Sequence, residues 1–141
     1  MIRAFRDDDM DVVLDIWLHA SIEAHAFIEP EFWKAQVENM REIYIPASET
    51  KVVVNDGEIV GFYSLHGNTL AAVFIYPEFQ GRGFGKALLS HALQQRDVLT
   101  LSVYKENTPG TQFYLSQGFV ILSEQIDEHT GHAEYLMSTV S

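Results

Sequence analysis

A glycine-rich segment, Gln80-Gly81-Arg82-Gly83-Phe84-Gly85-Lys86, joins an apolar run at 70–76 to an amphipathic helical pattern. Alternating glycines let the backbone approach a ligand without Cβ interference, and the first N–H groups of a helix point outward at the positive end of its dipole. Arg82 and Lys86 add positive charge to a chain whose formal net charge is −11. The segment therefore predicts an anion-binding loop, with phosphate as its natural ligand.

Two nucleotide-binding patterns fit this loop poorly. A Walker loop has a glycine five residues before its Gly-Lys pair and a Ser or Thr after it, but Gln80 and Ala87 occupy those positions here. A dinucleotide fingerprint reads G-x-G-x-x-G, with an acidic residue after the next strand. This loop reads G-x-G-x-G, and the next strand pattern carries Val103-Tyr104-Lys105. Both mismatches argue against a nucleoside triphosphate or a dinucleotide.

A third pattern, Gln/Arg-x-x-Gly-x-Gly/Ala, is matched in full by Gln80, Gly83 and Gly85. Pro77-Glu78-Phe79 precedes it, and a second motif follows at Asn107-Thr108-Pro109-Gly110-Thr111-Gln112-Phe113-Tyr114. In these two linked motifs, and along nearly its whole length, the chain resembles the GNAT N-acetyltransferases, in particular the small single-domain bacterial type. The resemblance implies that the glycine loop binds the pyrophosphate of acetyl-CoA.

The resemblance also implies how the rest of the cofactor would bind. In the family the fourth and fifth strands splay apart, and the pantetheine arm inserts between them and pairs with backbone groups that fall here on Val73 and Ile75. The Val73 N–H would polarise the thioester carbonyl and stabilise the oxyanion. The implied cofactor-binding residues are Val73, Ile75, Gln80, Gly81, Arg82, Gly83, Gly85, Lys86 and Asn107.

Tyr114 resembles the tyrosine of the family's second signature, whose hydroxyl donates a proton to the departing CoA thiolate. A phenol titrates near 10 and a thiol near 8.5, so the phenol can stay protonated until charge develops on sulfur. An aromatic residue beside Phe113 on an amphipathic helix is more commonly a core residue, but the linked motifs favour the catalytic role. Asn107 either contacts pantetheine or caps the helix.

The stretch from His25 to Trp33 resembles the loop that lines the acceptor pocket of small bacterial GNATs, some of which acetylate peptidyl lysine. Deprotonating a lysine amine at pH 7 costs about 4.6 kcal/mol, against about 1.1 for an α-amine. Protein lysine, protein N-terminus, polyamine, aminoglycoside and amino-acid acceptors all stay open. The implied substrate-binding residues are Glu23, His25, Phe27 and Trp33, and the general base is Glu23, His25, Glu29, Glu31, Glu78 or a backbone-held water.

Composition and charge indicate the number of domains and argue against several kinds of site and partner. The 141 residues, 47% of them hydrophobic, predict one domain at 1–141. The chain has no cysteine, so a thiol nucleophile is excluded and the amine would attack the thioester directly. His129 and His132 lack a second pair at ligand spacing, which argues against a metal site. The negative charge disfavours nucleic acid and anionic membranes, and the absence of a long apolar run predicts a soluble cytoplasmic protein. We expect a monomer or a homodimer.

Hydrophobic periodicity predicts, in chain order, a strand, two helices, three strands, a helix, a strand, a helix and two strands. This order is the GNAT topology: an α/β (α+β) fold with a mixed, mostly antiparallel, twisted sheet of about seven strands, helices on both faces, and a splay between strands four and five. Residues 70–76 should form a central strand covered on both faces. The first helix should end near Ser21, and Thr108 can cap the last one.

A second function class is a catalytically silent acyl-CoA-binding module that senses cofactor or regulates a partner. A sensor has no need of a positioned proton donor, so Tyr114 favours the enzyme.

Overall fold

The computed structural model describes residues 1–141. It contains one seven-stranded sheet in the order β1-β2-β3-β4-β5-β7-β6. Neighbouring strands are antiparallel except for β4 and β5, which are parallel. The predicted sheet and element order are confirmed. The strands are β1 (Ile2–Ala4), β2 (Glu49–Asn55), β3 (Glu58–His66), β4 (Thr69–Ile75), β5 (Thr100–Tyr104), β6 (Val120–Ile126) and β7 (Ala133–Ser138).

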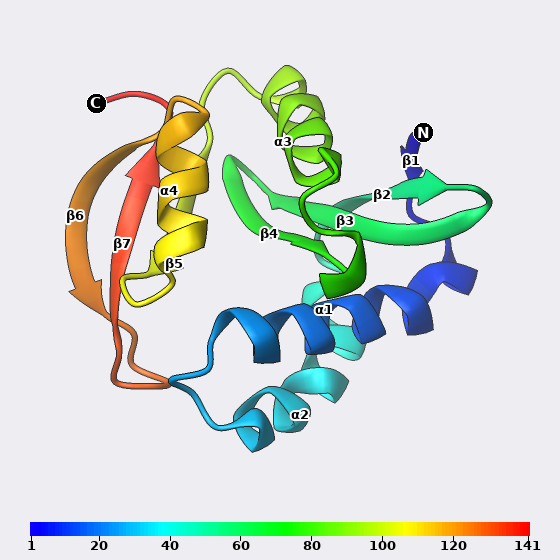
Figure 1. Ribbon diagram of the computed structural model, residues 1–141, viewed down its shortest axis with the longest axis horizontal. Helices are drawn as coiled ribbons and strands as arrows, with labels where there is room; N and C mark the ends of the chain where they lie inside the picture. Colours follow the sequence, from blue (N-terminus) through cyan, green and yellow to red (C-terminus); the bar gives the residue numbers. More distant parts are fainter.

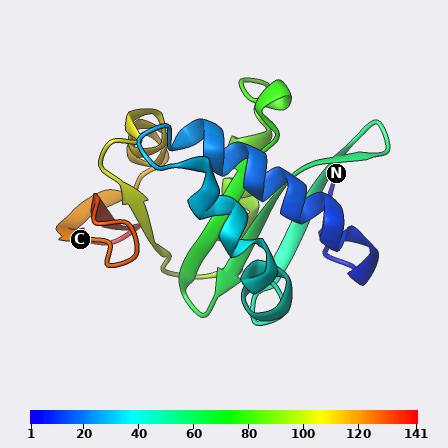
Figure 2. The ribbon, with the colours of Figure 1, turned by 90° about the horizontal axis from the view of Figure 1, so that it is seen from below.

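Helices cover both faces of the sheet (Figures 1 and 2). Helices α1 (Met10–Ala24) and α2 (Pro30–Asn39) lie on one face, and a π-helical turn at Met40–Tyr44 continues α2. Helices α3 (Phe84–Gln95) and α4 (Thr108–Ser116) lie on the other. Two short 3₁₀ turns, Asp7–Asp9 and Pro77–Phe79, precede α1 and the glycine loop.

Each face of the sheet has its own apolar core. The core under α1 and α2 is centred on Ile16, Val52 and Phe62, which are fully buried. The core under α3 and α4 includes Leu88 and Leu89 of α3, also fully buried. Burial of this kind contributes about 25 cal/mol per Å² of apolar surface. The sheet is thus held from both sides, which fixes the positions of β4 and β5.

Strands β4 and β5 pair at one position only, Thr69 with Thr100, and diverge beyond it. The predicted splay is confirmed. The prediction that β4 is a central strand covered on both faces is confirmed, because α1 packs on one face and α3 on the other. Ala71 is nevertheless exposed, and Val73 and Phe74 are only half-buried. The side chains of β4 also border the opening that the splay creates.

Two helix ends in the structure differ from those that the sequence predicts. Helix α1 continues past Ser21 to Ala24, so that His25 becomes its C-cap residue. Asn107, and not Thr108, caps α4: its Oδ1 accepts a hydrogen bond from the Gly110 N–H at 3.1 Å. A Cβ at Gly110 would lie 2.5 Å from Asn107 Nδ2, so the glycine makes room for this cap. No helix is long and apolar enough to cross a bilayer.

Candidate active site

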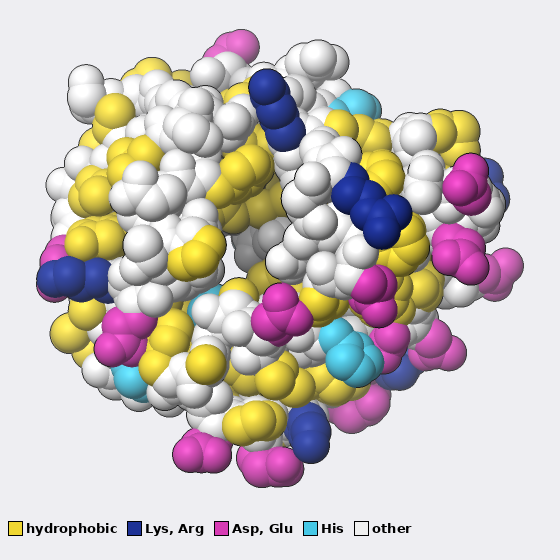
Figure 3. Space-filling view, viewed as in Figure 1, with side chains coloured by type: hydrophobic (Ala, Val, Ile, Leu, Met, Phe, Trp, Pro, Cys, Tyr) yellow, Lys and Arg dark blue, Asp and Glu magenta, His cyan; other side chains and the backbone are white.

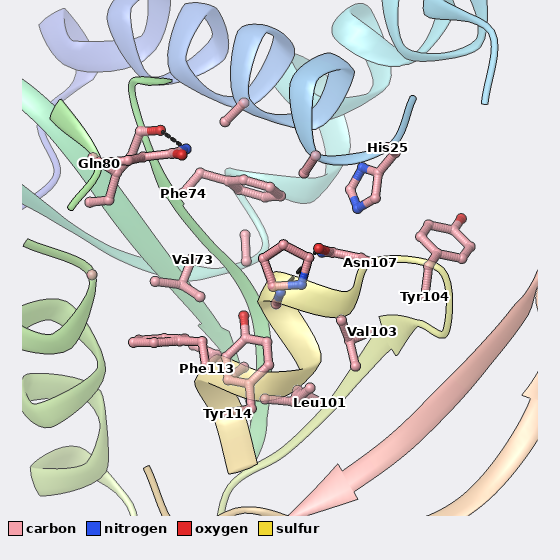
Figure 4. A pocket seen from close by; sticks show the side chains of 18 of the residues that line it. His25, Val73, Phe74, Gln80, Leu101, Val103, Tyr104, Asn107, Phe113 and Tyr114 are labelled. Atoms are coloured by element: carbon pink, nitrogen blue, oxygen red, sulfur yellow. Dashed lines mark hydrogen bonds between the residues drawn. The ribbon is translucent and has the colours of Figure 1, made fainter. Parts of the chain in front are cut away.

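A cleft of about 700 Å³ occupies the space between the splayed parts of β4 and β5. Figure 3 shows it as a hollow with hydrophobic side chains on its walls. The glycine loop forms one end, and the last turn of α1 together with Trp33 of α2 forms the other. Helix α4 contributes the wall beside β5 (Figure 4). One continuous cleft therefore joins the predicted cofactor loop to the predicted acceptor loop.

The glycine loop owes its shape to two residues with positive φ. Gly81 has φ 79° and Gly83 has φ 88°, and Gly83 is the N-cap residue of α3. Side chains other than glycine adopt this region at a cost of roughly 1–2 kcal/mol. No atom lies within 4 Å of a Cβ built on either glycine, so both face open space where a ligand can approach closely. The N–H groups of the first turn of α3 are directed toward this space.

The structure brings most of the predicted cofactor residues to the cleft. Gln80 orders the loop entrance, because its Nε2 donates to the Ile75 carbonyl at 3.2 Å. Arg82 lies outside the lining and places its guanidinium 5.1 Å from the centre of the Phe79 ring. The predicted residues that line the cleft are Val73, Ile75, Gln80, Gly81, Gly83, Gly85, Lys86 and Asn107.

The backbone of β4 offers free N–H groups to the cleft. The N–H of Tyr76 donates to the Val60 carbonyl on β3 at 2.9 Å. Because N–H directions alternate along a strand, the N–H groups of Val73 and Ile75 point away from β3, toward β5. Strand β5 has diverged there and cannot accept them. These two N–H groups are available to a ligand inserted between the strands.

Tyr114 of α4 stands beside these groups. Its ring is packed against Phe113 and Phe119, with centroids 5.4 and 5.7 Å away. In Figure 4 its hydroxyl points into the cleft, with His25 on the far side. Burial raises the pKa of the Tyr114 phenol above its usual value. The hydroxyl therefore stays protonated and can donate a proton at neutral and alkaline pH.

Of the predicted substrate-binding residues, His25 and Trp33 line the cleft, and Glu23 and Phe27 do not. His25 is only 7% exposed and lines the cleft; its ring stacks on Trp33 at 5.0 Å and meets the edge of Tyr104 at 5.2 Å. Phe27 lies outside the lining and packs against His25 and Tyr104. Glu23 is exposed and also lies outside the lining. The other predicted bases Glu29, Glu31 and Glu78 are exposed residues that do not line it.

Burial also sets the charge state of His25. Its pKa is lowered by desolvation, which the Ser21 carbonyl only partly opposes. The imidazole is therefore neutral at pH 7. Both its Nδ1 and the Nε1 of Trp33 are buried without a hydrogen-bond partner, an unusual state for polar atoms inside a protein.

Tyr104 and Glu134 line the cleft although the sequence did not single them out. They are cross-strand partners on β5 and β7. The Tyr104 hydroxyl donates to the Asp127 carboxylate, which also accepts from Thr130 Oγ1 at 3.1 Å. These bonds tie the β6–β7 turn to the end of β5. Tyr104 directly follows the alternating apolar residues of β5, and this alternation does not predict which side chains Tyr104 contacts.

No group of three His, Asp or Glu side chains is placed to hold a metal ion.

Residues 46–121 match the acetyltransferase (GNAT) domain family. The peptidyl-lysine N-acetyltransferase YiaC of Escherichia coli is 33% identical over 139 residues, covering 98% of this chain and 95% of that protein. The peptidyl-lysine N-acetyltransferase YjaB of Salmonella typhimurium is 30% identical over 140 residues, covering 99% of this chain and 96% of that protein.

Solved structures agree with these sequence relatives. The solution structure of apo YjaB from Escherichia coli superposes with a TM-score of 0.87 at 27% identity, over 100% of this chain and 97% of that one. The PaiA N-acetyltransferase of Thermoplasma acidophilum, solved with coenzyme A, has the same fold, with a TM-score of 0.83 at 18% identity over 98% and 96%. The chain is an N-acetyltransferase and belongs to the GNAT family.

Proposed function

We propose that this enzyme transfers the acetyl group of acetyl-CoA to the ε-amine of a lysine in a polypeptide. The observation that carries the proposal is the single cleft, which reaches from the glycine loop to the His25–Trp33 wall and has Tyr114 and the free β4 N–H groups between its ends. The names of the YiaC and YjaB relatives support peptidyl lysine as the acceptor. A net charge of −11 also favours a cationic acceptor over an anionic one.

The residues at the loop end fit acetyl-CoA. Gly81 and Gly83 leave the space in front of the α3 N-terminus open, and Lys86 supplies a positive side chain beside it. Phosphate groups suit such a position because helix N-terminal N–H groups and the helix dipole both favour negative charge. When bound, acetyl-CoA supplies the thioester as acyl donor. Val73 and Ile75 would pair with the amide groups of the pantetheine arm.

Catalysis would use two groups of the cleft. As the amine nitrogen bonds to the thioester carbon, the Val73 N–H donates a hydrogen bond to the carbonyl oxygen and stabilises its developing negative charge. As the C–S bond breaks, Tyr114 gives its proton to sulfur. Because burial raises the pKa of Tyr114, the phenol is in its protonated, donating form at neutral pH. The amine attacks directly, because the chain has no cysteine to form a thioester with the acetyl group.

We extend the proposal to the setting of the reaction. Acetyl-CoA is a cytoplasmic metabolite, so we place the enzyme in the cytoplasm. It would work as a single domain, residues 1–141, alone or as a homodimer, on an acceptor that is neither nucleic acid nor membrane.

A thiol-release assay with acetyl-CoA tests the proposal. The acceptors are a lysine peptide with a blocked N-terminus, the same peptide with norleucine in place of lysine and a free N-terminus, spermidine, and an aminoglycoside. We expect release with the lysine peptide and acetylation of its side chain by mass spectrometry. Release with spermidine or the aminoglycoside alone would contradict the peptidyl-lysine assignment. Absence of thiol release with every amine tested would favour the acyl-CoA sensor.

A further inference from the structure

His25 occupies a position that the fold fixes closely. It is the C-cap residue of α1, and its backbone N–H donates to the Ser21 carbonyl at 3.1 Å. Its ring lies against the face of Trp33 from α2 and the edges of Phe27 and Tyr104. Contacts from three elements therefore hold the imidazole in one orientation at the acceptor end of the cleft.

The ring has one accessible nitrogen. Apart from the Ser21 carbonyl, which partly opposes the lowering of the ring's pKa, neither nitrogen has a hydrogen-bond partner within the chain. Only Nδ1 is sealed from solvent, which leaves Nε2 accessible. No carboxylate lies within ion-pair distance of the ring, although His19 and His132 both have such a partner. A buried imidazole normally has a hydrogen-bond partner. An unpaired, neutral imidazole that lines a substrate cleft is instead available to a ligand.

Other bases are poorly placed. Among the residues that line the cleft, only His25 and Glu134 carry a side chain that can accept a proton at neutral pH. The Glu134 carboxylate accepts a hydrogen bond from Gln125 Nε2 at 2.9 Å, on the β6–β7 side of Tyr104. His25 has no such competing partner. The comparison favours the histidine as the group that meets the acceptor amine.

We propose that His25 is the catalytic residue that accepts the proton of the attacking amine; this inference rests on the proposed function. The amine lone pair forms the N–C bond while the carbonyl π electrons move to oxygen. The N–H bond then breaks, its electrons stay on nitrogen, and its proton goes to Nε2 of His25. The oxyanion electrons then re-form the C=O bond while the C–S electrons leave with sulfur, which takes the Tyr114 proton. Proton transfer through cleft water from the imidazolium to the phenolate restores both residues.

His25 accepts the proton only after the N–C bond has formed, so it does not have to deprotonate a lysine ammonium. A lysine ammonium has a pKa of about 10.4, far above that of a histidine, so His25 cannot deprotonate it to a useful extent before attack. Once the nitrogen has bonded to the carbonyl carbon it is strongly acidic, and a neutral imidazole is then a competent acceptor. His25 acts on the neutral amine fraction and does not create it.

Two substitutions separate this role from packing. His25→Phe keeps an aromatic ring against Trp33 but has no nitrogen. His25→Ala leaves a space beside the cleft that free imidazole can enter. We expect kcat to fall by roughly 10²–10⁴ in both variants, with acetyl-CoA affinity by calorimetry nearly unchanged. Added imidazole should restore part of the activity of His25→Ala and none of that of His25→Phe. His19→Phe, an exposed histidine on the same helix, is the matched control and should keep wild-type activity.

The pH profile gives an independent readout. The titratable groups that contact His25 or stand behind it are Tyr104 on β5 and, from the β6–β7 hairpin, Asp127, His132 and Glu134. With a lysine peptide, log(kcat/KM) should rise by two per pH unit where both His25 and the amine are protonated and by one per unit above the His25 pKa, which burial lowers from its ordinary value. In His25→Phe the slope should be one throughout.

Three results would overturn the inference while leaving the proposed function intact: His25→Phe within a few-fold of wild-type kcat, no imidazole rescue, or a slope change that is lost in Glu134→Gln and kept in His25→Phe. A wild-type protein that acetylates no amine would overturn the proposed function, and this inference with it.

Discussion

The two ends of the cleft are built in different ways. The cofactor end is a continuous segment, 80–86, in which backbone N–H groups and glycine conformations create the site. The acceptor end is assembled from side chains on four elements: His25 at the end of α1, Trp33 on α2, Tyr104 on β5 and Glu134 on β7. Changes at the first end should therefore affect cofactor affinity, and changes at the second should affect the acceptor and catalysis.

The largest expected effect lies where the two ends meet. Tyr114→Phe keeps the ring packed on Phe113 and Phe119 and removes only the hydroxyl, which has no hydrogen-bond partner within the chain. We expect kcat to fall by roughly 10²–10⁴, with little change in acetyl-CoA affinity or stability. Tyr135→Phe, the same change at another residue packed on this core, serves as the control. Steady-state kinetics with a lysine peptide measure both.

A Tyr114→Phe enzyme that turned over within a few-fold of wild type would show that solvent protonates the thiolate. Tyr114 would then be a packing residue.

The acceptor end should also show itself in the pH dependence. Above the His25 transition, kcat/KM with a lysine peptide should rise about tenfold per pH unit through at least pH 8, because the neutral amine fraction grows at that rate. Tyr114 should cause no fall up to pH 10, because burial raises its pKa and the donor form persists as pH rises. A profile that levels off between pH 7 and 8 would contradict direct use of the neutral amine.

At the cofactor end, Gly83→Ala should weaken acetyl-CoA binding roughly tenfold, because alanine disfavours positive φ by roughly 1–2 kcal/mol and the loop would relax away from the ligand. Gly57→Ala is a close control: its φ is 81°, it too faces open space, and it lies in the β2–β3 turn. Both variants should lose similar stability, but only Gly83→Ala should lose affinity by calorimetry. Equal affinities in the two would remove the loop from the cofactor site.

The smallest expected effect concerns the tie between β5 and the β6–β7 turn. Tyr104→Phe removes the donor to Asp127 and should cost about 1 kcal/mol of stability, with a rise of a few-fold in KM for the peptide. Tyr76→Phe removes a similar bond to Asp15, and Tyr76 does not line the cleft. It should therefore lower the melting temperature without changing that KM. A raised peptide KM in both variants would mean that stability, and not the turn, controls acceptor binding.

The same contrast decides how much the sequence could predict. At the cofactor end, the strand, the glycine spacing and the helix start are local signals, so the element order, the splayed pair and the loop were predicted. The partial exposure of β4 was not predicted, because apolar composition does not tell a fully buried strand from one that also borders a cleft. The Asn107 cap was left open since Asn and Thr both favour that position.

The acceptor end depends on tertiary structure. Glu23 and His25 are two residues apart, so on a helix their side chains point about 200° apart, and only the packing of α1 decides that His25 faces the cleft. Tyr104 and Glu134 meet through the register of β5 with β7. No local pattern encodes that register. The sequence could not separate His25 from the exposed residues Glu23, Glu29, Glu31 and Glu78, because only tertiary packing decides which of them lines the cleft.

Binding of a bisubstrate conjugate tests the central claim most directly, namely that one cleft holds both substrates. The conjugate joins the sulfur of CoA through an acetyl bridge to the lysine ε-nitrogen of a blocked peptide. Because linking makes the second binding event intramolecular, its affinity by calorimetry should exceed that of acetyl-CoA by roughly 10² or more. An affinity equal to that of acetyl-CoA would contradict the account, because the peptide part would then contribute nothing at the acceptor end.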